Sequence, residues 1–173
     1  MFIEDLPNRN RTVIIGVDPG LAATGAAVVT VTGGAFEIVL TETKRTPSKM
    51  LVPERLSAIS SWFAERLETY EPNYVSVEEV FMHGRHPATA VAMAQARGVI
   101  LAACGAVGVE VLEYAPRRVK QAITGSGRAS KEQVQKMVRR HLGLTEFPGD
   151  EHAADAAALA LCTAFGLEKG VNE

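Results

Sequence analysis

Short apolar runs near the start of the chain predict a sheet. Val13–Asp18, Val28–Val31 and Phe36–Leu40 are rich in β-branched or aromatic residues, with turn-forming residues between them. Gly33 and Gly34 can adopt the positive φ angles of a tight hairpin, so the second and third runs are expected to pair antiparallel. The short connection between the first two runs implies the same for them. The pattern therefore predicts three consecutive antiparallel strands.

The apolar period then changes to a helical one. Five apolar residues recur at helical spacing with charged residues between them: Leu56, Ile59, Phe63, Leu67 and Tyr70. The remaining pattern predicts a strand at 74–80, a small-residue helix at 88–106, a strand at 109–113, and helices that begin near 116, 130 and 147, the last ending near 164. Ser130 and Gln133 have the spacing of a capping box. This order predicts an α/β fold, a mixed sheet with helices on both faces.

Length and composition fit one soluble globular domain. A chain of 173 residues with 47% hydrophobic and 22% charged residues buries a sizeable core but is too short for two ordinary domains. We expect a flexible lead-in at residues 1–11, a single domain at 12–166 and a C-terminal tail at 167–173. No uninterrupted apolar run predicts a membrane span, and residues 1–11 lack the apolar stretch of a secretion signal.

Cysteine and charge usage add to this picture. Cys104 and Cys162 stand alone in alanine-rich segments, which favours buried free thiols in a reducing cytoplasm. A net charge of −2 does not itself indicate a nucleic-acid partner, so any DNA contact depends on local positive charge. Such charge gathers in one stretch: Arg117, Arg118, Lys120, Arg128 and Lys131. A run of this kind is commonly a solvated face, so the pattern alone leaves both interpretations open.

One carboxylate stands at the end of the first predicted strand. Pro19 cannot donate to a sheet ladder and Gly20 tolerates positive φ, so the strand ends at Asp18 and holds this acid in an apolar setting. A neighbouring cation would offset the cost of burying its charge. The alternative is a turn aspartate that hydrogen-bonds to its own backbone.

Other acids stand where they could complete a site. Glu78 lies near the end of the strand at 74–80, and functional groups gather at the carboxyl ends of parallel strands, so Glu78 is expected near Asp18. His152 and Asp155 are three residues apart and share one face of the last helix. Together the four side chains would form a small cage of oxygen and imidazole ligands, which suits Mg²⁺ or Mn²⁺ better than a structural zinc.

Structural roles compete with this interpretation. Asp150 and Glu151 are well explained as cap and first-turn acids that the helix dipole favours. Glu79 alternates to the face opposite Glu78. Taken alone, the histidine and aspartate of the last helix are ordinary helix residues.

Six sequence blocks resemble the RuvC family of Holliday-junction resolvases. The blocks are GVDPG at 16–20 with TG at 24–25, VEEVFM at 77–82, QARG at 95–98, EYAPRRVKQ at 113–121, Lys131 with QV at 133–134, and HAADA at 152–156. They occur in the family's order and at matching spacing from about residue 12 to residue 165, nearly the whole chain. One block would be a weak signal, whereas six in register are a specific one.

The resemblance implies a ribonuclease-H-like fold: a mixed five-stranded sheet whose first three strands are antiparallel, flanked by helices on both faces. It implies a homodimer that nicks two opposed strands of a four-way DNA junction symmetrically in recombination and repair. Two divalent metal ions per active site, Mg²⁺ or Mn²⁺, would support the hydrolysis, which leaves 5′-phosphate and 3′-hydroxyl ends. Family members work with the RuvA–RuvB branch-migration complex.

By position, Asp18, Glu78 and Asp155 match acids of the family's active site. The fourth position, often aspartate in the family, is His152 in this chain. Either His152 completes the metal site, or that role moves to Asp150 or Glu151 nearby. The spacing between His152 and Asp155 favours the histidine, because it preserves their shared face.

The resemblance also assigns DNA contacts. Lys120 and Lys131 match basic positions that lie beside the scissile phosphate in the family, and the rest of the basic stretch is expected to contact the DNA backbone. Phe81 matches an aromatic residue near the junction centre, where its ring would stack on an unpaired base. The alternative for Phe81 is a core side chain just beyond a strand.

Three rival functions are compatible with parts of the sequence. The glycine-containing block at 16–20 also resembles the phosphate loop of actin-like ATPases and sugar kinases, but those proteins need two such domains around the nucleotide. A catalytically weak junction-binding protein would account for His152, although three intact acids argue against it. A related ribonuclease-H-like nuclease for another structured nucleic acid would differ only in its substrate.

Overall fold

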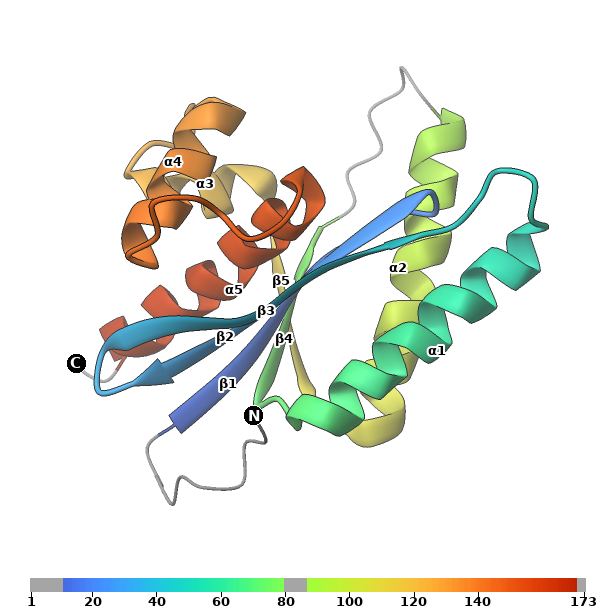
Figure 1. Cartoon of the computed structure of the whole chain (residues 1–173), viewed down its shortest axis with the longest axis horizontal. Coiled ribbons are helices and arrows are strands. Elements are labelled where there is room, and N and C mark those ends of the chain that lie inside the picture. Colours follow the sequence, from blue (N-terminus) through green and yellow to red (C-terminus); the bar gives the residue numbers. More distant parts are fainter. Residues whose placement is uncertain (1–10, 80–86, 171–173) are drawn as a thin grey trace.

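The sheet confirms the predicted strand order. A computed structural model describes residues 11–79 and 87–170 of the chain. Its single sheet has the order β3-β2-β1-β4-β5, with β1, β2 and β3 antiparallel and β4 and β5 parallel to β1 (Figure 1). The strands are β1 (Arg11–Asp18), β2 (Ala23–Thr32), β3 (Ala35–Arg45), β4 (Tyr74–Glu78) and β5 (Glu110–Tyr114).

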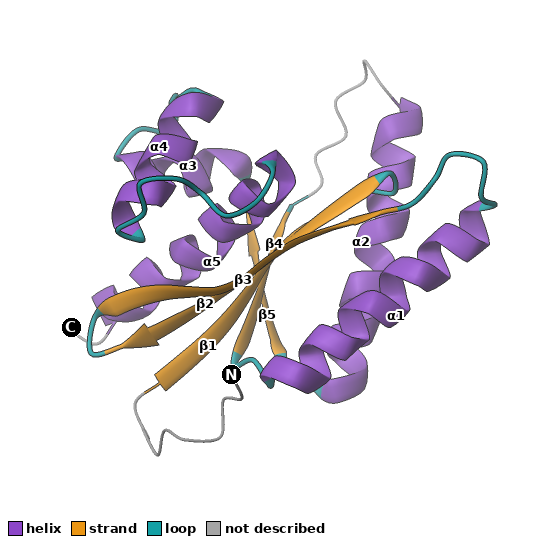
Figure 2. Ribbon diagram, in the orientation of Figure 1, coloured by secondary structure: helices purple, strands orange, loops and turns teal. Residues whose placement is uncertain are grey.

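Helices cover both faces of this sheet, as the sequence predicted (Figure 2). One face carries α1 (Val52–Tyr70) and α2 (Pro87–Val107); the other carries α3 (Pro116–Thr124), α4 (Lys131–His141) and α5 (Glu151–Gly170). The last helix runs past both its expected end near residue 164 and the expected domain limit at 166. Leu167 still packs against the core there, so the apolar face of α5 continues beyond the alanine run on which the prediction rested.

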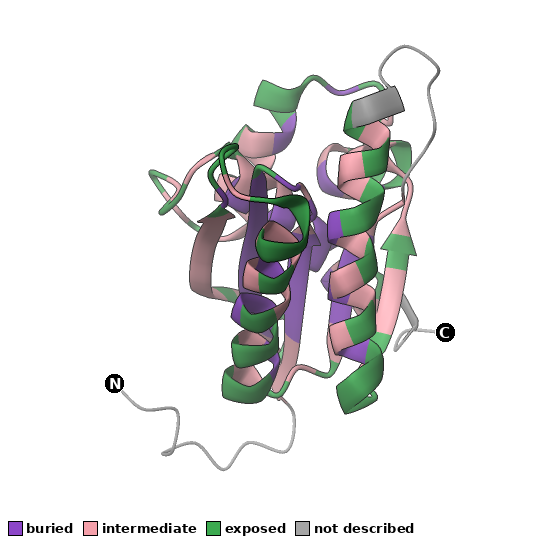
Figure 3. Ribbon diagram, turned by 90° about the vertical axis from the view of Figure 1, so that its right-hand side faces the viewer, coloured by how far each residue is buried: buried purple, intermediate pink, exposed green. Residues whose placement is uncertain are grey.

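Alternation along β1 distributes its residues between two cores. Ile15 and Val17 pack with α1 and α2, whereas Ile14 packs with the helices of the other face. All three are fully buried, and Figure 3 shows the buried centre of the sheet behind α1 and α2. Because successive side chains point to opposite faces, Asp18 emerges on the α5 side, one residue after Val17.

The same alternation holds in β4. Val75 and Val77 belong to the α1–α2 core, while the hydroxyl of Ser76 hydrogen-bonds to that of Thr163 on α5, with 2.6 Å between the oxygens. Glu78 therefore also emerges on the α5 side. Two acids from adjacent parallel strands thus face the same helix.

Two glycines bring α5 directly onto the sheet. A Cβ atom at Gly16 would collide with the backbone of Ala156, and one at Gly25 would collide with the backbone of His152. The missing side chains let the first turns of α5 lie against β1 and β2. This close approach carries the polar residues of α5 to the ends of the strands.

Several local predictions are confirmed. Ser130 caps α4 and forms the capping box with Gln133, and Pro116 stands in the first turn of α3. Gly33 and Gly34 have φ angles of 58° and 81° in the hairpin between β2 and β3.

The prediction for β3 was too short. It was expected at 36–40 but extends through the polar residues 41–45. An edge strand tolerates such residues because one side of it has no neighbouring strand to pair. Thr43 and Arg45 use their side chains to contact the start of α5, as described below.

One helix, α2, is apolar enough to bear on the expectation that the chain has no membrane span. Residues Thr89–Val107 form one helix with a mean hydropathy of 1.6, long and apolar enough to cross a membrane by length and composition alone. The helix also carries Arg97 and packs Ala96, Ile100 and Cys104 fully into the α1–α2 core. We interpret α2 as a core helix with an exposed apolar side.

Both cysteines, Cys104 and Cys162, are buried free thiols, as predicted. Burial raises the pKa of each thiol to about 11, which makes both thiols inert at neutral pH. The lead-in at 1–11 lies almost wholly outside the described residues, which begin at Arg11 in β1.

Candidate active site

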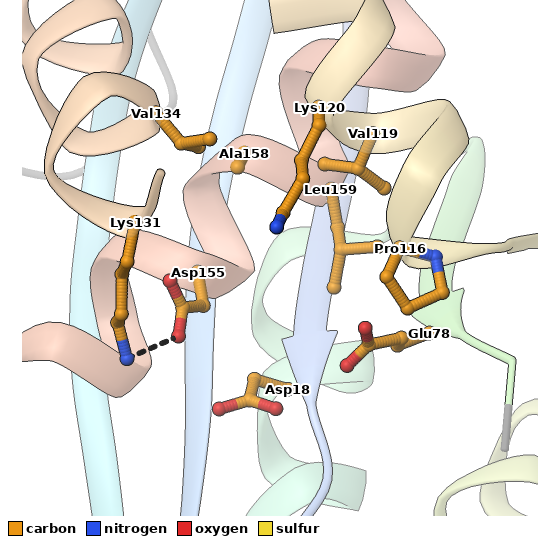
Figure 4. Close-up of a pocket in the computed structure, with 10 residues that line it drawn as sticks. All are labelled: Asp18, Glu78, Pro116, Val119, Lys120, Lys131, Val134, Asp155, Ala158 and Leu159. Carbon is orange, nitrogen blue, oxygen red and sulfur yellow. Dashed lines mark ion pairs between the residues drawn. The ribbon is translucent and has the colours of Figure 1, made fainter. Parts of the chain in front are cut away.

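Three elements bring acids to one pocket at the carboxyl ends of the strands (Figure 4). Asp18 comes from β1, Glu78 from β4 and Asp155 from the start of α5, and they line a cavity of about 230 Å³. Two lysines share it, Lys120 from α3 and Lys131 from α4. The other lining residues are mostly apolar: Pro116, Val119, Val134, Ala158 and Leu159. The predicted meeting of the strand-end acids with Asp155 is thus present in the fold.

His152 lies directly beside Asp18. Its Nδ1 is 2.9 Å from Oδ2 of Asp18, and 17% of the aspartate side chain is exposed against 32% of the histidine. The imidazole gives this poorly solvated carboxylate a polar partner.

None of Asp150, Glu151 and His152 lines the acid pocket itself, and His152 is distinguished from the two acids by its contact with Asp18. Asp150 is held on β3: it accepts hydrogen bonds from Thr43 Oγ1 at 2.5 Å and from the backbone amide of Ala153 at 3.2 Å, and it pairs with Arg45 at 2.6 Å. These partners outweigh the effect of its partial burial and lower the pKa of Asp150. Asp150 is therefore a helix cap that ties α5 to the edge strand, and it does not line the acid pocket.

Glu151 also points elsewhere. Its side chain is 61% exposed and pairs with Lys131 at 3.0 Å, and it does not line the acid pocket. Lys131 Nζ lies at the same distance, 3.0 Å, from Asp155 Oδ2 (Figure 4). Although partial burial opposes its charge, these two ion pairs raise the pKa of Lys131, which stays a cation at the mouth of the site.

The pocket concentrates negative charge. Burial, with the charges of Asp18 and Asp155 nearby, raises the pKa of Glu78 from its ordinary 4.5 to about 7. Burial also raises the pKa of Asp18, although the hydrogen bond from His152 works in the opposite direction. Burial and the repulsion between the acids thus outweigh the opposing charges of Lys120 and Lys131, so Glu78 keeps its proton to a higher pH.

These donors fit a hard divalent cation. Carboxylate oxygens and one imidazole are ligands that Mg²⁺ and Mn²⁺ accept, and a cation would relieve the mutual repulsion of the acids. In the described ranges, however, no three His, Cys, Asp or Glu side chains lie close enough together to hold one ion as they stand. The pairs His152–Asp18 and Lys131–Asp155 hold two of the carboxylates, so the compact cage expected from the sequence would require these side chains to rearrange.

The other predicted DNA-contact residues that the structure describes do not line the pocket. Arg117 and Arg128 are exposed, and the Arg117 side chain lies against Gly127 in the turn after α3. Arg118 is exposed on the other side of α3 and lines a separate cavity with Cys162 and residues of the α5 C-terminal half. Phe81 lies outside the described residues. Only the two lysines are therefore placed beside the acids.

The sequence pattern assigned no role to Arg97, which contacts the backbone of Glu78. Its Nε donates a hydrogen bond to the backbone carbonyl of Glu78 at 3.3 Å, and its guanidinium pairs with Glu113 on β5. Arg97 belongs to the QARG block of the resemblance, but its target is a backbone atom, which no residue pattern identifies. This contact ties α2 to the end of β4.

We expect Arg97→Gln to lower nicking about tenfold by loosening the strand end that carries Glu78, with a parallel loss of Mn²⁺ affinity measured by calorimetry. Arg66→Gln is the matched control: Arg66 is 20% exposed against 18% for Arg97 and also pairs with a glutamate, but in the α1–β3 contact away from the acids. Equal losses in both variants would indicate a general stability effect instead.

The raised pKa of Glu78 predicts a pH dependence of stability without metal. The unfolded chain releases this proton near pH 4.5, whereas the folded chain keeps it until about pH 7. The contribution of Glu78 to stability therefore declines as the pH rises between these values. Thermal unfolding in chelator should show this decline, and Glu78→Gln should reduce it, leaving the part that the raised pKa of Asp18 contributes; an unchanged pH profile in the variant would contradict the assignment.

Comparisons with known proteins agree with this geometry. The family model described as "Crossover junction endodeoxyribonuclease RuvC" matches residues 14–163. The chain is 44% identical over 160 residues to the RuvC of Rubrobacter xylanophilus, covering 92% of this chain and 89% of that protein. It is 43% identical to the RuvC of Heliobacterium modesticaldum over 92% of this chain and 98% of that one.

Solved structures give the same result. The Thermus thermophilus RuvC structure superposes with a TM-score of 0.85 and 38% identity, covering 92% of this chain and 97% of that chain. T. thermophilus RuvC in complex with Holliday junction substrate gives a TM-score of 0.86 and 39% identity, covering 92% and 96%. With a match along most of its length to the family model and to these relatives, the chain belongs to the RuvC family of crossover junction endodeoxyribonucleases.

Proposed function

We propose that this protein is a structure-selective endonuclease that resolves Holliday junctions by metal-dependent hydrolysis of phosphodiester bonds. The observation that carries the proposal is the pocket itself: three carboxylates from the ends of β1, β4 and the start of α5 face two lysines in a chain of the RuvC family. Acids whose pKa values are raised by burial and by one another's charges suit cation binding, and lysines beside them suit a phosphate.

Asp18, Glu78, Asp155 and His152 are the groups that we propose as ligands. Two divalent ions, Mg²⁺ or Mn²⁺, would supply an activated water and stabilise the leaving oxygen of an in-line displacement. Asp18 contacts His152 and lines the pocket with the other acids, so it would be the central ligand of the set. The products would carry 5′-phosphate and 3′-hydroxyl ends.

The two lysines would hold the scissile phosphate against these acids. Lys120 points into the pocket from α3, and Lys131 is the partner of Asp155 (Figure 4). If cations were bound to the acids, Lys131 would be free to turn from Asp155 to a phosphate oxygen. Arg117 and Arg128 extend the positive surface along the α3–α4 turn, where backbone contacts would make binding weaken steeply with salt.

We infer that the active form is a homodimer joined through α2. The outward side of this helix is an exposed stripe of small and apolar residues: Val91, Ala94, Gly98, Ala102 and Gly105. Val91 is 54% exposed, and a Cβ atom at Gly98 or Gly105 meets nothing within 4 Å in the single chain. A second copy of the stripe would cover this surface, and Arg97 connects the same helix to Glu78.

Gly98→Glu is expected to convert the dimer to a monomer and to replace paired nicks by single ones, because a charge on the stripe could not be buried in the seam. Sedimentation at micromolar concentration measures the change. Ser61→Glu, on the exposed side of α1, is the matched control and should remain dimeric. A monomeric unmodified chain at that concentration would contradict the dimer.

Family resemblance adds two further parts to the proposal. The protein would work in the cytoplasm, in DNA recombination and repair, alongside the RuvA–RuvB branch-migration complex. The buried free thiols are consistent with a reducing compartment.

The proposal is tested by mapping the products on a synthetic four-way junction with each strand labelled in turn. Symmetric nicks in two opposed strands that DNA ligase seals directly would support it. Tight binding without nicks would favour a catalytically weak junction-binding protein, and better cutting of another branched substrate would favour a related nuclease.

A further inference from the structure

A second cavity lies on the other side of Asp18 from the acid pocket. It has a volume of about 510 Å³ and is bounded by the turn from Asp18 to Ala23, by residues of α2 and by His152. The α2 residues are Thr89, Ala92 and Met93, which lie on the side of the helix that faces the turn, away from the exposed stripe. Asp18 is thus shared by two cavities.

The chemistry of the two cavities differs. The acid pocket contains two lysines, whereas no lysine or arginine is among the described residues that line the second cavity. Its wall is largely apolar, with Pro19, Leu21 and Ala23 buried in the turn. A phosphate would find no cationic partner there, while an uncharged aromatic group would find contact surface.

The position of the cavity next to the proposed phosphate site limits the kinds of chemical group that could occupy it. A phosphate held by Lys120 and Lys131, as proposed above, would lie in the acid pocket beside Asp18, and the DNA strand would leave the pocket from there. Asp18 lines both cavities, so the second cavity is adjacent to the place where that phosphate would bind. The group attached next to a phosphate in DNA is a nucleoside.

We propose that this cavity binds the unstacked base of the nucleotide that flanks the scissile phosphate. The inference rests on the proposed junction-nicking function and adds a site for substrate selection to it. Bases at a branch point cost less to unstack than bases inside a continuous duplex. A site that requires an unstacked base would therefore favour junctions, and its shape would set which base is accepted next to the nick.

The size and side chains of the cavity suit this occupant. A volume near 510 Å³ is in the usual range for small-molecule sites. The thioether of Met93 is polarizable and adapts to an aromatic ring, and stacking of one base on a protein side chain contributes roughly 1–3 kcal/mol. Thr89 adds a hydroxyl at the rim that can donate to or accept from a base edge.

The test fills the cavity and monitors the base directly. Ala22 is an exposed residue of the lining, so Ala22→Phe places a ring in the cavity without disturbing a buried side chain. Met93→Ala removes the proposed stacking group as a second variant. Ala35→Phe, equally exposed but in the β2–β3 hairpin at the other end of the sheet, is the matched control. Thermal unfolding verifies that each variant is folded.

Two readouts are used with each protein. A four-way junction carrying 2-aminopurine beside the expected nick reports unstacking by its fluorescence, recorded in chelator so that no strand is cut. A pool of junctions with random bases around the crossover reports the base preference of nicking in Mn²⁺. We expect the unmodified chain and Ala35→Phe to raise the fluorescence severalfold and to cut with a defined base preference.

We expect the fluorescence rise and the base preference to be lost only in the two cavity variants. Ala22→Phe should abolish the fluorescence rise, lower nicking about tenfold and flatten the base preference, and Met93→Ala should change both readouts in the same direction. An undiminished rise and an unchanged preference in both variants would overturn the base site while leaving the nicking function intact. Absence of nicks in every protein, the unmodified chain included, would instead overturn the proposed function, and the base site with it.

Discussion

Asp18→Asn is expected to lower junction nicking at least about a thousandfold, which corresponds to roughly 4 kcal/mol of transition-state stabilisation. The carboxylate stands between His152 and the pocket that holds Glu78 and Asp155, so a neutral amide in its place removes the charge on which cation binding there depends. Junction affinity should change only a few-fold, because the lysines and arginines that contact phosphate are unaltered. Single-turnover nicking and a binding titration on the same junction separate the two effects.

The same substitution should stabilise the metal-free fold. Burial raises the pKa of Asp18, so the charged form is the costly one in the folded chain, and asparagine removes that charge while it can still bond to His152. A gain of 1 kcal/mol would raise Tm by about 2–4 °C. Glu79→Gln removes a charge near the same sheet edge and should leave nicking unchanged. Nicking by Asp18→Asn at the rate of the unmodified chain would eliminate the proposed role of Asp18 as a metal ligand.

His152→Ala is expected to lower nicking about a hundredfold, the second-largest loss. The imidazole is both the partner of Asp18 at 2.9 Å and the fourth proposed ligand, and alanine removes both. His152→Asp should retain most of the activity and shift the preference from Mn²⁺ toward Mg²⁺, because an oxygen donor replaces a nitrogen donor. Nicking rates across a series of both metals measure this shift.

Glu151→Gln and Asp150→Asn serve as comparisons for the histidine. Glu151 is exposed and paired with Lys131, so its neutral variant should nick nearly as the unmodified chain does. Asp150→Asn weakens the contacts with Thr43 and Arg45, so it should lower the stability of the fold more than it lowers the affinity for metal. If Glu151→Gln instead loses as much activity as His152→Ala, the fourth ligand is Glu151 and the assignment to His152 is wrong.

Much of this site could be predicted because its acids end strands. An apolar run followed by Pro19 and Gly20 fixes where β1 stops, and the alternation in β4 places Glu78 on the same face as Asp18. The three-residue spacing in α5 adds His152 and Asp155 to one side of that helix. Local patterns thus locate each acid on its element, and parallel pairing of β1 with β4 brings the strand ends together.

The supporting contacts could not be predicted, because they join residues far apart in the chain. Asp150 contacts Thr43 and Arg45 on β3, more than a hundred positions away. These two residues lie in the polar end of β3, which the apolar pattern did not identify as part of the strand. Arg97 donates to the backbone carbonyl of Glu78, and because every residue has such a carbonyl, the sequence does not identify this partner. Contacts of this kind depend on sheet register and helix placement, which only the assembled fold determines.

These contacts also explain how the fold orients its catalytic groups. The Asp150 cap fixes the start of α5 against the edge strand, and Arg97 fixes the end of β4 against α2. Both lie outside the acid pocket, yet each supports an element that carries one of its acids. Because α2 also carries the proposed dimer stripe, assembly and the position of Glu78 are linked through one helix.

The most direct test of the central claim compares a synthetic four-way junction with linear duplexes of the same sequences, each with Mg²⁺, with Mn²⁺ and with chelator. The account predicts paired nicks in opposed strands of the junction alone, present with either metal, absent in chelator and absent with Asp18→Asn. Equal cutting of the linear duplexes, or tight junction binding with no nicks under either metal, would contradict it.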